Sequence, residues 1–177
     1  MSSTRVNVDE RVISGLREIC GDEGVSTDEK RLVNYGRDKI TEEHYAGRAD
    51  VVVWPSSTEE VVRIVQLART MEVPITPRGG GSGLSGGAVP VRGGIVLAME
   101  RMKRVLEVDT DNLVVVLEPG VVTKELDRIL EPYGLFFAGY PMSEGSARSA
   151  ATWPRTPAAV ARSSTALPGT TCWACKW

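Results

Sequence analysis

The sequence lacks the features that mark several large classes of protein. No stretch approaches the roughly twenty apolar residues of a membrane span, and the opening MSSTRVNVDE has no apolar core of the kind found in secretory signals. The net charge of −2 comes without a basic block, which argues against nucleic acid as the main partner. Three cysteines, scattered and odd in number, do not make a disulfide framework. The 177 residues therefore predict a soluble, cytoplasmic protein with one real hydrophobic core.

Groups that carry chemistry are equally scarce. His44 is the only histidine, and no second ligand or nucleophile stands near it in the sequence, so we interpret it as structural. Cys172 and Cys175 form one C-x-x-C without a partner pair, which is weak evidence for a zinc or redox site. The sequence thus offers no catalytic residue and no metal site.

Glycine is what the sequence has in excess, gathered between Pro77 and Pro90 in the string PRGGGSGLSGGAVP. Such a density would ruin a helix or strand interior, but it permits positive φ and lets the backbone approach a ligand closely. Successive N–H groups can then converge on one anion, with the hydroxyls of Ser82 and Ser85 as further donors. We therefore expect residues 79–87, called the glycine loop below, to hold a diphosphate.

Other interpretations of the glycine loop fit less well. A flexible linker is possible on composition, but apolar, strand-like runs flank the loop on both sides. The phosphate loop of ATPases requires G-K-[ST], and no lysine follows any glycine here. Residues 81–86 match the dinucleotide fingerprint G-x-G-x-x-G literally, yet that motif needs a helix to begin within it, and Gly87 and Pro90 exclude one.

The flanking sequence predicts helices on both sides of short strands. Apolar spacing predicts a helix over 9–20 that Gly21 ends, and S-x-x-E capping boxes place helix starts at Ser26 and Ser57. The second of these helices should face inward with Val61, Ile64, Val65 and Ala68. Thr123 is expected to cap a helix whose inward residues are Leu126, Ile129 and Leu130. Strands are expected at 51–54, 75–76, 95–99, 105–108 and 113–117, with a tight turn at 109–112.

Three linked motifs carry a resemblance to a known family. They are VxPxSxEEV at 53–61, PxxPRGGGSGLSGG at 74–87 and EPGV at 118–121. In this order they resemble the FAD-binding (PCMH-type) domain of the vanillyl-alcohol oxidase and para-cresol methylhydroxylase superfamily. Within it the chain is most similar to the glycolate oxidase catalytic subunit and D-lactate dehydrogenase group, over about residues 30–146.

The resemblance implies an α+β fold, with a first subdomain of a small mixed sheet flanked by helices and part of a second subdomain. It divides the chain into an N-terminal helical segment (1–45), a partial FAD-binding domain (46–146) and a non-native or disordered tail (147–177). In intact relatives the flavin N5 accepts hydride from C2 of a 2-hydroxy acid. A separate substrate-domain or electron-acceptor subunit is a further expectation, through which the protein would lie at the periphery of the inner membrane.

The resemblance also assigns the residues that contact FAD. The glycine loop should cradle the pyrophosphate, and Gly120 with the turn at 141–143 should lie against the flavin side. Arg78 is expected to shape the loop or face the phosphate, with a solvated arginine as the alternative. The complete set is Arg78, Gly79, Gly80, Gly81, Ser82, Gly83, Leu84, Ser85, Gly86, Gly87, Gly120, Pro141, Met142 and Ser143.

The family pattern stops after Ser146. The following residues contain no Asp or Glu but three of the four tryptophans, and they show neither helical nor strand periodicity. We explain this by the loss of one nucleotide after the codon for Ser146. Residues 150–157 can be encoded so that the alternative frame reads G-N-V-A-E-N-A, which resembles the segment that relatives carry there.

These observations leave three classes of function open. The first is a fragment of a flavin-dependent 2-hydroxy-acid oxidoreductase, such as a glycolate oxidase or D-lactate dehydrogenase, that is inactive alone. The second is a non-catalytic FAD-binding module completed by a separate chain. The third is a structural domain without a cofactor.

Overall fold

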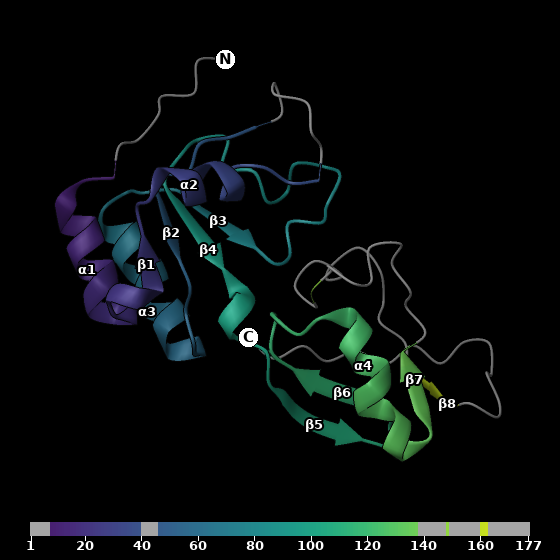
Figure 1. The fold of residues 1–177 in the computed structure, drawn as a ribbon. Helices are drawn as coiled ribbons and strands as arrows, with labels where there is room; N and C mark the ends of the chain where they lie inside the picture. Colours follow the sequence, from purple (N-terminus) through teal and green to yellow (C-terminus); the bar gives the residue numbers. More distant parts are fainter. Residues whose placement is uncertain (1–7, 40–45, 138–147, 149–159, 163–177) are drawn as a thin grey trace. The chain divides into compact units, whose positions relative to one another are not determined.

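The computed structural model describes residues 8–39, 46–137, 148 and 160–162. The chain divides into two compact units, Met1–Arg101 and Met102–Trp177, which are described separately (Figure 1). Both units combine helices with strands, which confirms the predicted α+β class. His44 and most of the predicted tail lie outside the described residues.

The first unit is built on a four-stranded mixed sheet with the strand order β1-β2-β4-β3. The strands are β1 (Val25–Ser26), β2 (Val51–Val53), β3 (Ile75–Arg78) and β4 (Ile95–Ala98). β4 pairs in parallel with both β2 and β3, and β1 pairs antiparallel with β2. Every residue of β2 and β4 is buried, as their continuous apolar sequences predict for strands covered on both faces.

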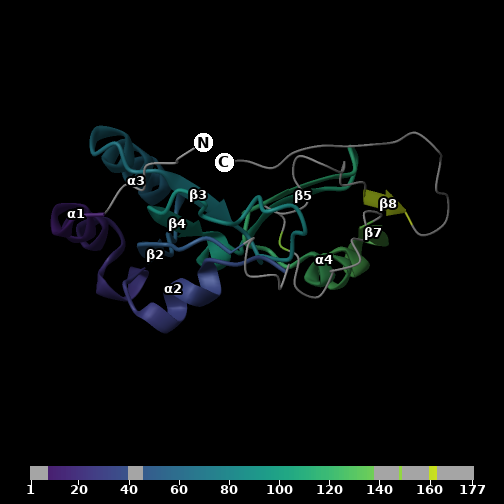
Figure 2. The same ribbon diagram turned by 90° about the horizontal axis from the view of Figure 1, so that it is seen from above.

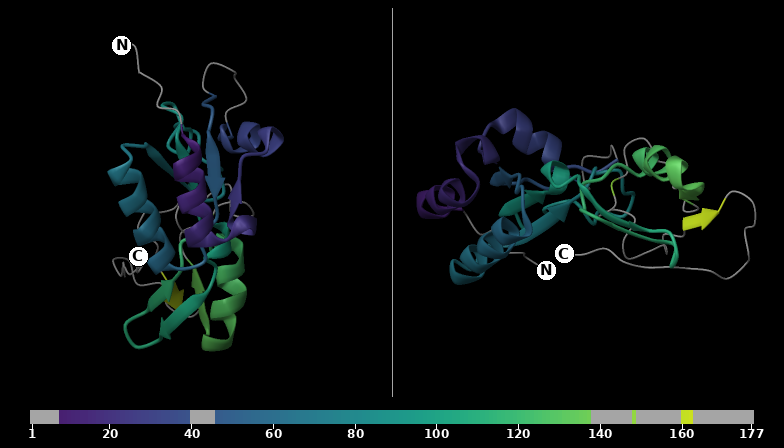
Figure 3. Two further views of the ribbon diagram at one scale, coloured as in Figure 1. Left: turned by 90° about the vertical axis from the view of Figure 1, so that its left-hand side faces the viewer. Right: turned by 90° about the horizontal axis from the view of Figure 1, so that it is seen from below.

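Helices cover both faces of this sheet. The helix α2 (Glu29–Tyr35) lies on one face, where Leu32 and Tyr35 pack with Val52 and Val96. The helices α1 (Glu10–Cys20) and α3 (Thr58–Thr70) lie on the other face (Figures 2 and 3). The described part of this unit also contains the short 3-10 turns η1 (Asp22–Gly24) and η3 (Met99–Arg101).

Side-chain caps begin the long helices, and the cap at Ser57 is the one that the sequence predicts. Asp9 caps α1 by accepting a hydrogen bond from Val12 N at 3.0 Å. Ser57 caps α3 by accepting one from Glu60 N at 3.2 Å. In a capping box the Glu60 carboxylate would accept a hydrogen bond from the Ser57 amide, but here it accepts one from the Ser56 amide at 2.7 Å. The predicted capping box therefore differs in this one donor.

Two predictions in this unit are wrong. Ser26 does not begin a helix: it belongs to β1, and Asp28 caps α2 by accepting from Arg31 N at 3.1 Å. Ser26 is not available as a cap because β1 pairs with β2 and Ser26 lies in that strand. Asp28 can replace it because aspartate caps helices as well as serine does. Val65 was expected to face inward but is 46% exposed, because α3 buries only the narrower stripe of Ile64 and Ala68.

The second unit consists of a β-hairpin and a helix. The strands β5 (Val105–Asp109) and β6 (Val114–Leu117) pair antiparallel, and the Asp109 carboxylate accepts hydrogen bonds from Asp111 N and Asn112 N in the predicted turn. The helix α4 (Thr123–Leu130) follows, with η4 (Glu131–Tyr133) and β7 (Leu135–Phe137) after it.

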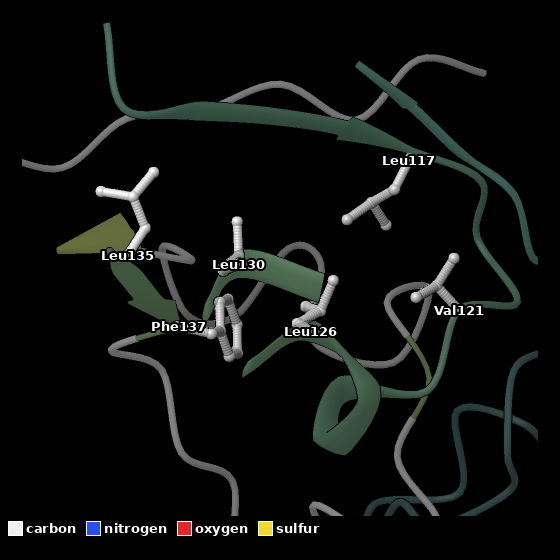
Figure 4. Close-up of a cluster of buried hydrophobic side chains, with 6 residues drawn as sticks. All are labelled: Leu117, Val121, Leu126, Leu130, Leu135 and Phe137. Carbon is white, nitrogen blue, oxygen red and sulfur yellow. The ribbon is translucent and has the colours of Figure 1, made fainter. Parts of the chain in front are cut away.

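Six side chains from β6, the segment between β6 and α4, α4 itself and β7 point toward one another and form the core of the second unit (Figure 4). They are Leu117, Val121, Leu126, Leu130, Leu135 and Phe137. The predicted inward residues Leu126 and Leu130 belong to this core, whereas Ile129 is half-buried. Thr123 is not the cap of α4, because Val122 occupies that position and Thr123 is itself the buried first residue of the helix.

Part of the predicted tail also has regular structure. Val160–Arg162 form β8, which pairs antiparallel with β7, where the sequence showed no strand periodicity. Pairing with an existing strand supplies hydrogen bonds that three residues cannot obtain alone. No helix in the described part of the chain is long and apolar enough to cross a membrane.

Candidate functional site

The glycine loop leaves the sheet at the end of β3 and returns to its parallel neighbour β4. Arg78, the last residue of β3, pairs with Ala98, the last residue of β4. No helix begins between the two strands, all of whose connecting residues are described. This confirms that the literal dinucleotide fingerprint is misleading and that the loop runs between two strands, near the carboxyl ends of parallel strands where α/β sheets bind ligands.

The loop backbone depends on glycine at particular positions. Gly81 (φ 64°) and Gly86 (φ 71°) lie in the left-handed region, which other residues adopt only with strain. A Cβ atom on Gly81 would collide with the Arg78 guanidinium, whereas one on Gly83, Gly86 or Gly87 would meet nothing within 4 Å. The loop is therefore tightly packed at Gly81 and open on the side of Gly83, Gly86 and Gly87.

Arg78 lies beneath the loop and contacts it directly. Its Nη1 donates a hydrogen bond to the Arg37 carbonyl oxygen at 2.5 Å, and its guanidinium lies 5.2 Å from the centroid of the Tyr35 ring. Burial lowers the pKa of Arg78, while Tyr35, Glu100 and Asp38 act in the opposite direction. Arg78 was expected either to shape the loop, to face the phosphate or to be solvated. Its half-buried position and these contacts are typical of a loop-shaping residue.

Aromatic side chains hold Arg78 in place. The Tyr35 and Trp54 rings meet edge to face at 5.5 Å, and Trp54 Nε1 donates to the Tyr35 hydroxyl at 3.2 Å. That hydroxyl donates in turn to Glu100 Oε2 at 2.8 Å. Burial is the main cause that raises the pKa of Tyr35, and Glu100 adds to it. Sequence reasoning missed this network, whose members are adjacent only through the sheet and α2.

The chain segment after α2 also contacts the glycine loop. The Gly86 amide donates to Asp38 Oδ2 at 2.9 Å, and the Lys39 amide donates to the Gly83 carbonyl at 3.2 Å. Sequence reasoning missed these contacts too, because 48 residues separate Asp38 from Gly86 and no local pattern marks the pair.

The predicted flavin-side residues belong to the second unit. Gly120 is buried, donates its amide hydrogen to the Met102 carbonyl at 2.6 Å and accepts from Arg148 Nη1 at 2.8 Å. Nearby, the buried Glu118 carboxylate accepts from Arg104 Nε at 2.9 Å, Nη2 at 2.7 Å and backbone N at 2.7 Å. Pro141, Met142 and Ser143 lie outside the described residues. No group of three or more metal-ligating side chains gathers within the described ranges.

The comparisons with known proteins define the class. The family model described as "FAD binding domain" matches residues 49–156, and the chain therefore belongs to this family, whose cofactor is FAD. The match continues to residue 156, past Ser146, where the motif resemblance ends. The family model and the three motifs thus lead to the same assignment, which confirms the predicted family and cofactor.

Several relatives are named as oxidoreductases. A probable mitochondrial D-lactate dehydrogenase of Danio rerio is 36% identical over 77% of this chain and 27% of its own length. Glycolate oxidase subunit GlcD of Bacillus subtilis is 35% identical over 72% of this chain and 27% of its own length. D-lactate dehydrogenase of Archaeoglobus fulgidus is 49% identical over 53% of this chain and 21% of its own length. The chain spans about a quarter of the length of these relatives.

Solved structures agree on the fold. An alkyldihydroxyacetonephosphate synthase is similar with a TM-score of 0.74 and 25% identity, over 86% of this chain and 33% of that one. p-Cresol methylhydroxylase is similar with a TM-score of 0.72 and 19% identity, over 85% of this chain and 31% of that one. These likenesses confirm the predicted PCMH-type fold.

The residues present fit the pyrophosphate of FAD. Among the residues that the structure describes, the amides of Gly80, Gly81 and Ser82 donate no hydrogen bond to the protein. Amides of this kind on successive loop residues are the donors that an anion requires. The half-buried Arg78 cation beneath the loop adds favourable electrostatic potential for a negative ligand.

Proposed function

We propose that this chain is the FAD-binding portion of a flavin-dependent 2-hydroxy-acid oxidoreductase of the glycolate or D-lactate type. The single observation that carries the proposal is the glycine loop at the ends of β3 and β4, open on one side and underlain by Arg78. Relatives that bear the names D-lactate dehydrogenase and glycolate oxidase support the substrate class.

Each predicted site residue has a proposed part in holding the cofactor. The glycine loop would bind the diphosphate through its amides, and Arg78 would support the loop from below. Gly120 and the turn at 141–143 would lie on the flavin side. When bound, FAD supplies an N5 atom that accepts hydride from C2 of the substrate.

The protein residues bind and orient, and we assign none of them a catalytic role. The described site residues are glycines, two serines, one leucine and Arg78, and none of these is an acid or base of the kind that activates a hydroxy acid. We therefore propose that the chain is inactive alone. We also propose that it consists of an N-terminal segment (1–45), an FAD-binding part (46–146) and a tail (147–177). We also propose a cytoplasmic location.

A second candidate is a non-catalytic FAD-binding module that a separate chain completes. The observation that favours it is the composition of the glycine loop, which offers backbone amides for a diphosphate but no acid or base for a reaction. The separate chain would supply the substrate domain or the electron acceptor. Restoration of flavin absorbance on co-purification with such a chain would favour this candidate over the first.

Titration of the purified chain with FAD tests the proposal, followed by flavin fluorescence and thermal melting. Ligand binding to the native state should raise the melting temperature by mass action. The matched variants are Gly86→Ala and Gly21→Ala: both glycines have φ near 70° and open space at the Cβ position, but only Gly86 lies in the loop. Both substitutions should destabilise the fold, and only Gly86→Ala should weaken FAD binding.

The contradicting results are equally specific. Equal FAD affinity in both variants would place the site elsewhere, and an unchanged melting temperature with FAD would favour the cofactor-free structural domain. Glycolate or D-lactate together with a dye acceptor should give no reduction by the chain alone. Reduction of the dye would overturn the proposed inactivity.

A further inference from the structure

Three consecutive residues after α2 each form one hydrogen bond with the glycine loop or with the arginine beneath it. We propose that residues 37–39 are a brace that fixes the loop in its anion-binding shape, with Asp38 as the decisive positioning residue. This proposal rests on the proposed function for its purpose, but the brace can be tested without FAD.

The three contacts are spread along the loop. Arg37 O accepts from Arg78 Nη1 at the start of the loop, and Lys39 N donates to Gly83 O at 3.2 Å in its middle. Asp38 Oδ2 accepts from Gly86 N at 2.9 Å near its end. A loop rich in glycine has a large conformational entropy to lose on ordering, so contacts at three points decide whether it keeps one shape.

The brace is itself anchored to the core of the first unit. It continues directly from α2, where Gly36 N donates to Leu32 O at 2.9 Å and Gly47 N donates to Gly36 O at 2.8 Å. A Cβ atom on Gly36 would collide with the Gly47 carbonyl, so the chain is closely packed on this side. Tyr35, one residue before Gly36, is held by Trp54 and Glu100.

Asp38 is decisive because it contacts the loop through its side chain, whereas Arg37 and Lys39 form their contacts through backbone atoms. Its carboxylate accepts a charge-assisted hydrogen bond, which is stronger than a bond between neutral groups. The same negative charge also opposes a diphosphate on the neighbouring amides, although Arg78 offsets part of it. Asparagine at this position would keep an acceptor oxygen and remove the charge, whereas leucine would remove both.

Hydrogen exchange of the Gly86 amide, measured by NMR on the full chain without FAD, tests the brace directly. We expect Asp38→Leu to speed this exchange by about tenfold or more, and Asp38→Asn to change it by no more than about threefold. The control is Asp9→Leu, which also removes one backbone-to-carboxylate hydrogen bond, from Val12 at 3.0 Å, far along the chain. The control should leave the exchange of Gly86 unchanged.

FAD titration of the same variants gives the second readout. Asp38→Leu should weaken FAD binding by about tenfold, while Asp38→Asn should bind FAD as tightly as the unmodified chain or more tightly. Unchanged Gly86 exchange in Asp38→Leu, or equal losses in the leucine and asparagine variants, would overturn the brace. Absence of FAD binding by the unmodified chain would instead overturn the proposed function, and the exchange measurement would still decide the brace.

Discussion

A graded series of alanine substitutions in the glycine loop separates backbone strain from packing. Gly83 lies outside the left-handed region and has open space at its Cβ position. Gly86 has φ 71° and open space, so alanine there meets strain alone. Gly81 has φ 64°, and its Cβ would also collide with the Arg78 guanidinium. Alanine therefore meets neither effect at Gly83, backbone strain at Gly86, and both backbone strain and a collision at Gly81.

The magnitudes follow from these differences. Gly83→Ala should stabilise by up to about 1 kcal/mol, because alanine restricts the unfolded chain. Gly86→Ala should cost about 1–2 kcal/mol for the left-handed backbone. Gly81→Ala should cost roughly 2–5 kcal/mol, because overpacking adds about 1–3 kcal/mol to the strain. The guanidinium has little freedom to move away, since Arg37 O and the Tyr35 ring hold it.

Urea unfolding of the three variants, followed by circular dichroism, measures the free energy of unfolding. The expected order of stability is Gly83→Ala, then Gly86→Ala, then Gly81→Ala. Equal stability of the Gly81 and Gly86 variants would refute the close packing of Arg78 against the loop. A double substitution with Arg78→Ala should recover the part of the Gly81 loss that comes from the collision.

The remaining predictions concern titration and the gene. Burial acts to raise the pKa of Glu118, but Arg104 outweighs it and holds this pKa below its usual value. The second unit should therefore lose stability as pH falls below about 4.5, and Glu118→Gln should flatten that dependence in acid unfolding curves. Burial, with Glu60, raises the pKa of Cys20 to about 12, so alkylation at pH 8 should be about a thousandfold slower than in the unfolded chain. Sequencing across the codon for Ser146 should reveal the family segment in the alternative frame.

Each of these has an outcome that contradicts it. Glu118→Gln with an unchanged acid transition would show that this carboxylate does not govern the pH dependence. Alkylation is best followed with Cys172 and Cys175 replaced by serine, and equal native and unfolded rates would contradict the raised pKa. An alternative frame without the family segment would refute the lost nucleotide.

Local sequence signals predicted those elements whose causes are local. The helix start at Ser57, the buried strand 51–53 and the turn after Asp109 all arise from residues within four positions of one another. The same local reasoning misplaced the start of α2, because pairing of β1 with β2 took Ser26 into the sheet. Strand pairing therefore overrode the local capping pattern at Ser26.

The glycine loop was predictable as a loop between two strands, but the residues that shape it were not. Glycine density and flanking strands indicated a diphosphate, and the family assignment confirms FAD as the cofactor. Asp38 and Tyr35 reach the loop and Arg78 only through the fold, across 48 residues in the case of Asp38 and Gly86. No periodicity or motif connects residues that the sheet topology brings together.

The central claim is that the loop binds FAD through its diphosphate. Its most direct test is thermal melting of the purified chain with FAD, ADP or riboflavin at matched concentrations. FAD and ADP both carry a diphosphate and should raise the melting temperature in proportion to their occupancy, while riboflavin, which has none, should leave it unchanged. A rise with riboflavin equal to that with FAD, or no rise with any of the three, would contradict the account.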